Sequence, residues 1–438
     1  MNIALQYHRA TNVDADDKTY GLDLTRTPEM RPAPFHDYGD AGRLPLETSV
    51  AGWLLQDGAG IVRSQPGRDY GGGTMHWRGY SSAGALYPVE AYVAAPDGLY
   101  SFDALGRALV RIAQGDARSA LAHAAGVPEL GDAAAVVVLT GIHARTGWKY
   151  QERGYRHTWW DAGTMLANLL ALAAAGDLRP RLYTAFVDGK VNRLLGVDGT
   201  HEYALALLAL GEGGEPKLEF SMLSVRGLES GPRYPLAERL HEASSLGDEE
   251  AVRRWRVRLD GEEPKLSQEE LVRAIRSRRS AREYEDEPLS PDELTDLLAW
   301  AEAPIPTDAP RVVRQLVTVA AVEGLEPGTY DAGLKLVRAH DKPQLRELVG
   351  FAAMEQDHPR IAAANVFQLA DLDAVVERLG DRGYRWAQLE AGIRAGRLQI
   401  GAFMRGWGAA ASTFYDDEVS RVLETQDAPM LMVAIGRV

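Results

Sequence analysis

The segment Arg-Arg-Ser-Ala-Arg at residues 278–282 carries side chains well suited to binding a phosphate group. Arg278 and Arg282 offer planar, fork-shaped sets of N–H donors, and Ser280 adds a hydroxyl between them. The alternative is a surface cluster in which the arginines pair with the acidic residues that follow at 283–287. The segment is therefore a candidate anion site.

A second candidate is the turn Arg-Gly-Tyr-Ser-Ser-Ala-Gly-Ala-Leu-Tyr-Pro at residues 78–88. Its small residues let backbone N–H groups approach a ligand closely, and Gly84 can adopt a positive φ. Ser81 and Ser82 add hydroxyls, and Arg78 adds a cation where the turn begins. The sequence matches no Walker or dinucleotide-binding motif, so an ordinary turn is the alternative interpretation.

The third candidate is the adjacent pair Lys149 and Tyr150, which could act as general base and acid if burial lowers the pKa of the lysine. The alternative is a pair of ordinary surface residues. The chain has no cysteine, which excludes disulfides, thiolate metal ligands and cysteine nucleophiles. Any electron transfer must therefore come from a bound cofactor. The histidines show no metal-ligand spacing, so we predict no metal site.

Helices and strands must position these residues. The nearly apolar segment 161–175 predicts a buried helix. Ser267 and Ser290 are predicted N-caps, because a glutamate follows each after three residues, and they begin helices on either side of the arginine segment. Residues 1–40 are polar and contain several prolines, which predicts an arm or loop. Apolar runs predict strands at 90–95, 134–140 and 203–210.

The chain repeats itself at a nearly constant offset. Glu-Arg-Gly-Tyr-Arg at 152–156 returns as Asp-Arg-Gly-Tyr-Arg at 381–385, 229 residues later. Phe-Val-Asp at 186–188 returns as Phe-Tyr-Asp at 414–416, with an offset of 228. This period excludes solenoid repeats, which recur every ~20–50 residues. The repeat predicts two like domains that imitate a homodimer, with the functional site where the halves meet.

The predicted architecture is therefore α+β in duplicate, with helices flanking a few strands in each half. Both copies of the first motif run on to a glycine, at Gly163 and Gly392. The segment 241–266 is rich in charged residues and is the predicted linker. The first domain then covers residues 1–240 and the second covers 267–438.

Composition limits the function classes. The 438 residues are 45% hydrophobic and 25% charged, which is ordinary for a soluble globular protein. The net charge of −14 argues against nucleic acid as a partner. The N-terminus lacks a basic region followed by a long apolar stretch, so no signal peptide is expected. No apolar run approaches the ~18–20 residues of a membrane span, so the expected location is the cytoplasm.

Two sets of these motifs resemble known flavoproteins. Residues 275–282, followed by Pro-Leu-Ser at 288–290 and a helix, resemble the opening of nitroreductase-fold proteins. That resemblance implies that Arg278, Ser280 and Arg282 bind the phosphate of FMN. The first half resembles the SagB-type dehydrogenases, which oxidise thiazoline and oxazoline rings in ribosomal peptides to thiazoles and oxazoles. The segments that carry this second resemblance are 82–88, 149–150 and 161–163.

Each half departs from the family pattern in a different way. The first half has no Arg-x-Ser-x-Arg where one is due, and the stretch 26–38 is proline-rich instead. The second half has Asp-Ala-Pro-Arg at 308–311 in place of the serine turn, and no Lys-Tyr pair beside Gly383. In the family, FMN lies at the dimer interface and contacts both subunits. The resemblance therefore implies one composite site, in which Arg278, Ser280 and Arg282 act together with Ser81, Ser82 and Gly84, and an inactive symmetry-related site.

The leading hypothesis is an FMN-dependent oxidase or dehydrogenase that converts an azoline to an azole. Lys149 or Tyr150 would handle the proton, flavin would accept the hydride, and O₂ would reoxidise the flavin. One alternative is an NAD(P)H-dependent nitro- or quinone reductase, and another is a non-catalytic flavin-binding subunit of a peptide-modifying complex. The expected partners are a small-molecule or peptide substrate and a cyclodehydratase or other natural-product biosynthetic enzyme. The chain is expected to be pseudo-dimeric, which leaves higher oligomers open.

Overall fold

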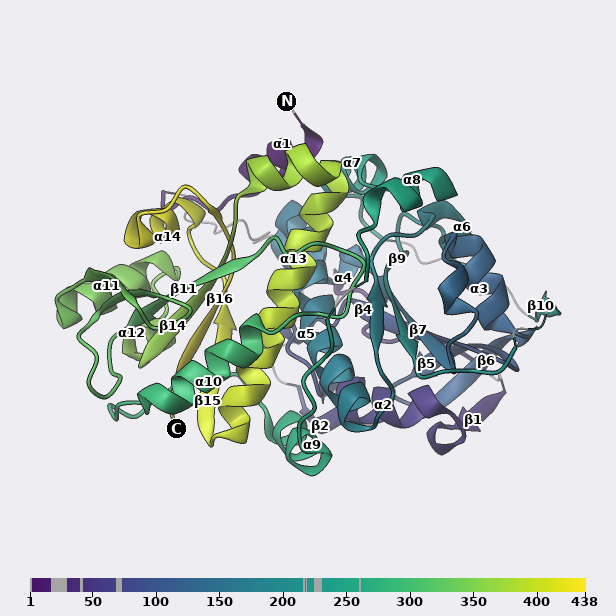
Figure 1. Ribbon diagram of the computed structural model, residues 1–438, viewed down its shortest axis with the longest axis horizontal. Coiled ribbons are helices and arrows are strands. Elements are labelled where there is room, and N and C mark those ends of the chain that lie inside the picture. The colour runs from purple at the N-terminus through teal and green to yellow at the C-terminus, as the bar shows by residue number, and fades with distance from the viewer. Residues whose placement is uncertain are drawn as a thin grey trace.

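Two antiparallel sheets, each with its own helices, lie on either side of two long central helices (Figure 1). The computed structural model describes residues 2–16, 30–39, 42–67, 73–215, 217, 219–223, 231–259 and 261–438. Helix α5 (Gly154–Ala175) belongs to the first half and α13 (Leu372–Met404) to the second. The α+β class and the tandem arrangement are thereby confirmed.

The first sheet has the strand order β1-β6-β5-β4-β7-β9-β8, and β10 pairs with β6. The apolar runs predicted as strands form β4, β7 and β9, in which every residue is buried. Strands covered on both faces read as continuous apolar runs, which explains why these three were visible in the sequence. The strands are β1 (Arg43–Pro45), β4 (Val89–Ala95), β5 (Gly98–Asp103), β6 (Ala108–Gly115), β7 (Ala135–Gly141), β8 (Arg181–Tyr183), β9 (Tyr203–Leu210) and β10 (Phe220–Met222), and a separate hairpin is formed by β2 (Ile61–Pro66) and β3 (Thr74–Arg78).

The second sheet has the strand order β13-β12-β11-β14-β16-β15. Its strands are β11 (Arg314–Val319), β12 (Gly328–Asp331), β13 (Leu336–Ala339), β14 (Ala364–Ala370), β15 (Trp407–Ser412) and β16 (Ala428–Arg437). The remaining α-helices of the two halves are α2 (Val50–Ala59), α3 (Ala117–Ala125), α4 (His143–Tyr150), α6 (Asp188–Leu195), α9 (Gln268–Ser277), α10 (Pro291–Glu302), α11 (Lys342–Ala352), α12 (Asp357–Ile361) and α14 (Asp416–Leu423). The hydroxyls of Ser267 and Ser290 accept from the third backbone N–H of α9 and α10, which confirms both predicted N-caps.

The two central helices approach each other at the duplicated glycines. A Cβ atom on Gly163 would lie 2.5 Å from the Cα of Gly392, and one on Gly392 would lie 2.6 Å from the carbonyl oxygen of Trp160. Only glycine permits this approach, which explains why both copies of the motif run on to one. Helix α5 begins at Gly154, seven residues before the predicted start, because its first two turns carry polar side chains.

The repeated motifs pair across the boundary between the halves. In the first copy, Arg153 and Arg156 each place Nη1 2.8 Å from a carboxylate oxygen of Asp416 in the second copy. In the reciprocal contacts, Arg382 and Arg385 of the second copy each place Nη1 2.7 Å from a carboxylate oxygen of Asp188 in the first copy. All these side chains are buried. The repeat therefore encodes a two-fold-like interface, as in a homodimer.

The N-terminal arm prediction is wrong for its first residues, which form helix α1 (Ile3–Ala10). The side chain of Asn2 caps this helix, accepting from Ala4 N at 2.9 Å. Ala4 N also donates to Asp381 of the second half at 2.7 Å, so α1 is docked on the interface. Residues 17–29 and 40 of the predicted arm lie outside the described residues.

Helix α7 (Pro235–Ala243) makes contacts with the first half that correspond to the contacts of α1 with the second half. His8 of α1 lies 3.3 Å from the hydroxyl of Tyr384, and His241 of α7 lies 3.1 Å from the hydroxyl of Tyr155. The predicted linker 241–266 thus includes the end of α7 as well as α8 (Glu249–Trp255). The repeated structure therefore begins with α7, upstream of residue 267.

In the described part of the chain, no helix is long and apolar enough to cross a membrane. The same residues contain no group of three or more metal-ligating side chains placed to hold an ion.

Candidate active site at the domain interface

The serine turn is fastened to the central helix α5. The hydroxyl of Ser82 donates to Oδ2 of Asp161 at 2.5 Å, and Ala83 N donates to Oδ1 of the same carboxyl at 3.1 Å. Thr164, one turn further along α5, donates to the carbonyl of Ser81 at 2.6 Å. These bonds fix the turn so that its hydroxyls and backbone face a cavity.

Gly84 has a φ of +62° and a ψ of 16°, and Ala85 and Tyr87 of the same turn also have positive φ values, of 52° and 47°. A Cβ on Gly84 would also lie 3.3 Å from the hydroxyl of Tyr150. Both the backbone conformation and the close approach favour glycine. Tyr150 therefore reaches directly over the serine turn.

Lys149 and Tyr150 end helix α4, and both are half-buried. The ring of Tyr150 stacks on His157 of α5, with centroids 4.1 Å apart and planes 17° apart. Nζ of Lys149 lies 5.3 Å from the centre of the Tyr150 ring. Burial, and then the positive charge of Arg282, lower the pKa of Lys149. This is the direction in which a lysine becomes a usable base.

The second half contributes the other wall. Ala281 N donates to the carbonyl of Ala409 at 3.2 Å, so the Arg-x-Ser-x-Arg segment runs beside β15. Nη1 of Arg282 lies 3.1 Å from Nε2 of His358, and that nitrogen lies 2.6 Å from the hydroxyl of Ser412. Burial, and then Arg282, lower the pKa of His358 to about 4, so the imidazole is neutral at physiological pH.

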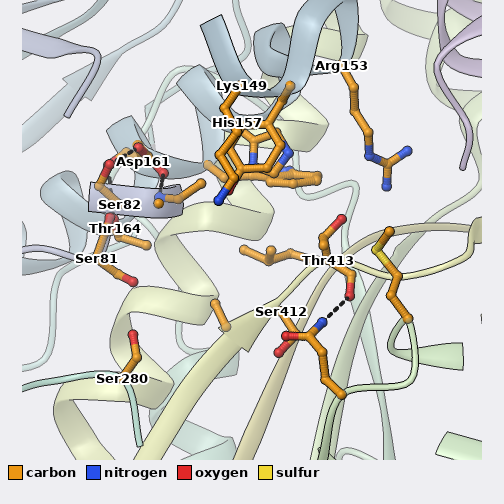
Figure 2. A pocket seen from close by; sticks show the side chains of 18 of the residues that line it. Ser81, Ser82, Lys149, Arg153, His157, Asp161, Thr164, Ser280, Ser412 and Thr413 are labelled. Carbon is orange, nitrogen blue, oxygen red and sulfur yellow. Dashed lines mark hydrogen bonds between the residues drawn. The ribbon is translucent and has the colours of Figure 1, made fainter. Parts of the chain in front are cut away.

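These two walls enclose one cavity of about 350 Å³. Small-molecule sites span roughly 300–1,000 Å³. Figure 2 shows Lys149 and His157 on one side, with Ser280 and Ser412 on the other. The predicted residues that line the cavity are Ser81, Ser82, Gly84, Lys149, Tyr150, Ser280 and Arg282.

Two predicted residues, Arg78 and Arg278, lie behind the cavity wall instead. Arg78 is 1% exposed and donates to Val89 O at 3.1 Å, with Glu90 3.6 Å away. Arg278 donates to the carbonyl of Tyr80 at 3.0 Å, so it crosses from the second half to hold the serine turn. Both residues support the turn from outside the cavity, and a direct role in cofactor binding stays a prediction.

Sequence reasoning missed the face that α5 presents to the cavity. Arg153 lies one residue before the helix, and the lining residues then follow at helical spacing, as His157, Trp160, Asp161 and Thr164. Residues three and four apart share a helix face, so this periodicity was readable once a helix start near residue 154 was assumed. Trp160 lines the cavity, whereas Trp159 does not appear among its lining residues.

The cavity is rich in positive charge. Lys149, Arg153 and Arg282 line it, and the acid among its lining residues is Asp161. Burial raises the pKa of Asp161 to about 7, although the hydrogen bonds from Ser82 and Ala83 favour its carboxylate. Near neutral pH the site therefore carries a net positive charge, which suits an anionic ligand.

In the counterpart region of the other half, Trp386 occupies the position of His157. Its indole donates to Pro310 O at 2.7 Å. With Arg382, Thr184 and Leu389, the indole borders a space of only about 10 Å³. Trp386 also borders a hollow of about 430 Å³, whose other lining residues include Glu302, Arg311, Glu390 and Arg394. The serine turn and the Lys-Tyr pair have no equivalents there.

The types of residue that line the cavity are suited to binding FMN. Phosphate suits the guanidinium of Arg282 and the hydroxyl of Ser280, and a flavin ring suits the small residues 81–84 beside Tyr150. Ser280 and Arg282 are exposed, so both side chains are open to a ligand.

Comparisons with known proteins agree with this architecture. The model of the nitroreductase family matches residues 62–212 and 275–437, one segment in each half. A crystal structure from Anabaena variabilis, described as that of a nitroreductase, matches with a TM-score of 0.83. The match covers 100% of this chain and 99% of that one at 24% identity, which shows a shared fold.

Two curated proteins are also similar. A protein of Methanocaldococcus jannaschii named as a nitroreductase, MJ1384, is 28% identical over 187 residues, covering 40% of this chain and 94% of its own. The microcin B17-processing protein McbC of Escherichia coli is 27% identical over 133 residues, or 28% of this chain. That match spans 49% of McbC, about half its length. Because the family model matches both halves, this chain belongs to the nitroreductase family, whose members are FMN-dependent oxidoreductases.

Proposed function

We propose that this chain is an FMN-dependent dehydrogenase of the SagB type, which oxidises a thiazoline or oxazoline ring to the corresponding azole. The observation that carries the proposal is the position of Lys149 and Tyr150, which line the same cavity as the serine turn and Arg282. A reductase supplied with electrons by a nicotinamide needs no base for its substrate. The similarity to McbC, a protein named for processing microcin B17, supports the same reading.

The chain's own residues manage the proton in this proposal. Aromatising an azoline removes a proton from one ring atom and a hydride from its neighbour. When bound, FMN supplies the acceptor for that hydride. Lys149, with its lowered pKa, accepts the proton at Nζ, and the hydroxyl of Tyr150 holds the substrate against the serine turn. The stack of Tyr150 on His157 keeps the phenol in place.

Cofactor binding is assigned to residues from both halves. Ser280 and Arg282 would hold the phosphate, and Ser81, Ser82 and Gly84 would border the ring system. Arg78 and Arg278 would act by holding the turn in position. The proposed partners are a peptide substrate and the biosynthetic enzymes that form its azoline rings, and the proposed location is the cytoplasm.

The experiment compares Tyr150→Phe and Lys149→Ala with the parent protein on a synthetic thiazoline peptide, measuring loss of two hydrogens by mass spectrometry. General acid–base groups contribute ~10²–10⁴-fold to rate, so kcat should fall by that factor while FMN content is unchanged. Arg378→Ala and Leu379→Ala, at the counterpart positions, are matched controls and should leave kcat unaltered. Normal turnover in both active-site variants would contradict the proposal.

A nitro- or quinone reductase is the second candidate, favoured by the similarity to MJ1384 over 94% of that protein. It predicts rapid NAD(P)H oxidation with a nitroarene that neither Tyr150→Phe nor Lys149→Ala slows. The same protein preparations answer both questions.

A further inference from the structure

Arg153 presents unused hydrogen-bond donors at the cavity. Its Nη1 donates to Thr11 O at 2.6 Å and to Asp416 at 2.8 Å. Its Nε and Nη2 are buried, and neither has a hydrogen-bond partner among the residues that the structure describes. In Figure 2 the guanidinium points toward the part of the cavity bounded by Thr413. Nε and Nη2 lie on one side of the guanidinium, so they form an open fork.

The counterpart arginine in the other half uses the same fork. Nε and Nη2 of Arg382 both donate to the carbonyl of Thr184, at 2.9 and 2.6 Å. The counterpart of Thr184 is Ser412, 228 residues later, and Ser412 lines the cavity. The cavity thus occupies the space that the Arg382–Thr184 contact closes in the other half. The open fork is a feature of the functional half alone.

His157 shows the same asymmetry. It is 3% exposed, and both of its ring nitrogens lack a hydrogen-bond partner within the described part of the chain. The ring is held in place by Tyr150 and by Trp160, whose ring centre is 4.6 Å away. Its counterpart Trp386 is hydrogen-bonded to Pro310 O. Buried polar groups are nearly always paired in folded proteins, so two unpaired groups at one cavity point to a ligand.

Charge defines the ligand that would pair them. Arg153 and Arg156 share a single carboxylate, that of Asp416, so this buried cluster carries an excess positive charge. Burial first, and then Arg153, Arg156 and Lys149, hold the pKa of His157 well below its usual range, so the imidazole is a neutral donor and acceptor. A carboxylate matches an arginine fork through two parallel hydrogen bonds.

We propose that Arg153 and His157 form a subsite for a carboxylate of the substrate, so that the heterocycle oxidised here carries a carboxylate group. This inference rests on the proposed function, because it names the substrate class of the same cavity. The fork of Arg153 holds the carboxylate, and His157 donates a hydrogen bond to one of its oxygens.

The test compares benzoate with benzamide, a neutral molecule of nearly the same shape, by calorimetric titration of the purified protein. Benzoate should bind about tenfold or more tightly than benzamide, as expected for a hydrogen bond between charged groups. Arg153→Lys keeps the charge that faces Asp416 but removes the fork, so it should weaken this preference. Arg382→Lys is the matched control, because it makes the same change in the closed half, and it should keep the preference.

A second variant, His157→Phe, keeps the ring contacts and removes both nitrogens, so it should weaken benzoate more than benzamide. Equal binding of the two ligands by the parent protein, or a preference that Arg153→Lys leaves undiminished, would overturn the proposal. If Arg153→Lys loses FMN while Arg382→Lys retains it, the fork binds the cofactor and the substrate assignment is wrong. Calorimetry measures the preference for benzoate over benzamide whether or not flavin is bound. A protein that binds no FMN would contradict the proposed function, and the comparison of benzoate with benzamide would still test the carboxylate subsite.

Discussion

Replacing Asp161 with asparagine should make the protein more stable at alkaline pH, although it removes a charge from the candidate site. Asp161 is 3% exposed and fixes the serine turn through Ser82 and Ala83. Burial raises its pKa from 3.8 to about 7, with the two hydrogen bonds opposing the shift. Asparagine has the same shape and can still accept from Ala83 N, but it cannot ionise.

The sign and size of the effect follow from linkage. The folded chain holds the Asp161 proton more tightly than the unfolded chain, so its contribution to stability is complete below pH 3.8 and is lost as pH rises through about 7. One pKa unit corresponds to about 1.4 kcal/mol, so the shift amounts to about 4 kcal/mol in all. Between pH 5 and pH 8 the parent protein should lose about 3 kcal/mol through this group.

The assay is urea unfolding of the parent protein and Asp161→Asn at several values between pH 5 and pH 8. The difference in the free energy of unfolding isolates Asp161, because the other groups titrate equally in both proteins. Ser82→Ala gives a second check: it removes a hydrogen bond that favours the carboxylate, so the folded-state pKa of Asp161 rises further, and the loss of stability should continue to higher pH and be larger by pH 8. Parallel pH profiles for parent and Asp161→Asn would refute the reasoning, since they would mean that the folded state does not perturb this carboxyl.

Three further predictions test the composite site and the interface. Flavin released from the purified protein should amount to one FMN per chain, and a ratio near two would show that the second half-site also binds. The double variant Arg278→Ala/Arg282→Ala should bind FMN at least about tenfold more weakly in a fluorescence titration, because it removes a phosphate contact and a support of the serine turn, and unchanged affinity would mean that neither arginine contributes to FMN binding. Asp188→Asn and Asp416→Asn should each lower the free energy of unfolding by about 3–5 kcal/mol, measured by urea denaturation, because each leaves two buried guanidinium groups without an anion. A loss within experimental error would mean that water satisfies those arginines.

The sequence revealed the strands and caps whose causes are local. β9 lies at the predicted residues 203–210, because a strand buried on both faces needs an unbroken apolar run. The N-caps at Ser267 and Ser290 depend on residues only three positions apart. Helix α1 was missed because its stability comes from contacts such as Ala4 with Asp381, 377 residues away. No local pattern carries that information.

The residues of the candidate site fall into the same two groups, those with a local sequence signal and those without one. The serine turn, the Lys-Tyr pair and the arginine segment were visible as short motifs, and the structure brings residues of all three to one cavity. Arg153 was seen only as part of the repeat, because its partner Asp416 is distant in sequence. The two motifs recur at offsets of 229 and 228, and this agreement was the one sign that they contact each other.

The repeat also explains how the two halves can differ at the candidate site. In a homodimer, one sequence must serve both interfaces, so an arginine that faces a ligand at one site faces a ligand at the other. Duplication removes that constraint. Arg382 can close its fork on Thr184 while Arg153 keeps its fork open, and Trp386 can fill the space that His157 leaves. The ion pairs to Asp188 and Asp416 are the same in both halves because they stabilise the interface. The residues that differ between the halves are those that face the cavity. Residues that are the same in both copies therefore belong to the interface, and residues that differ belong to the candidate site.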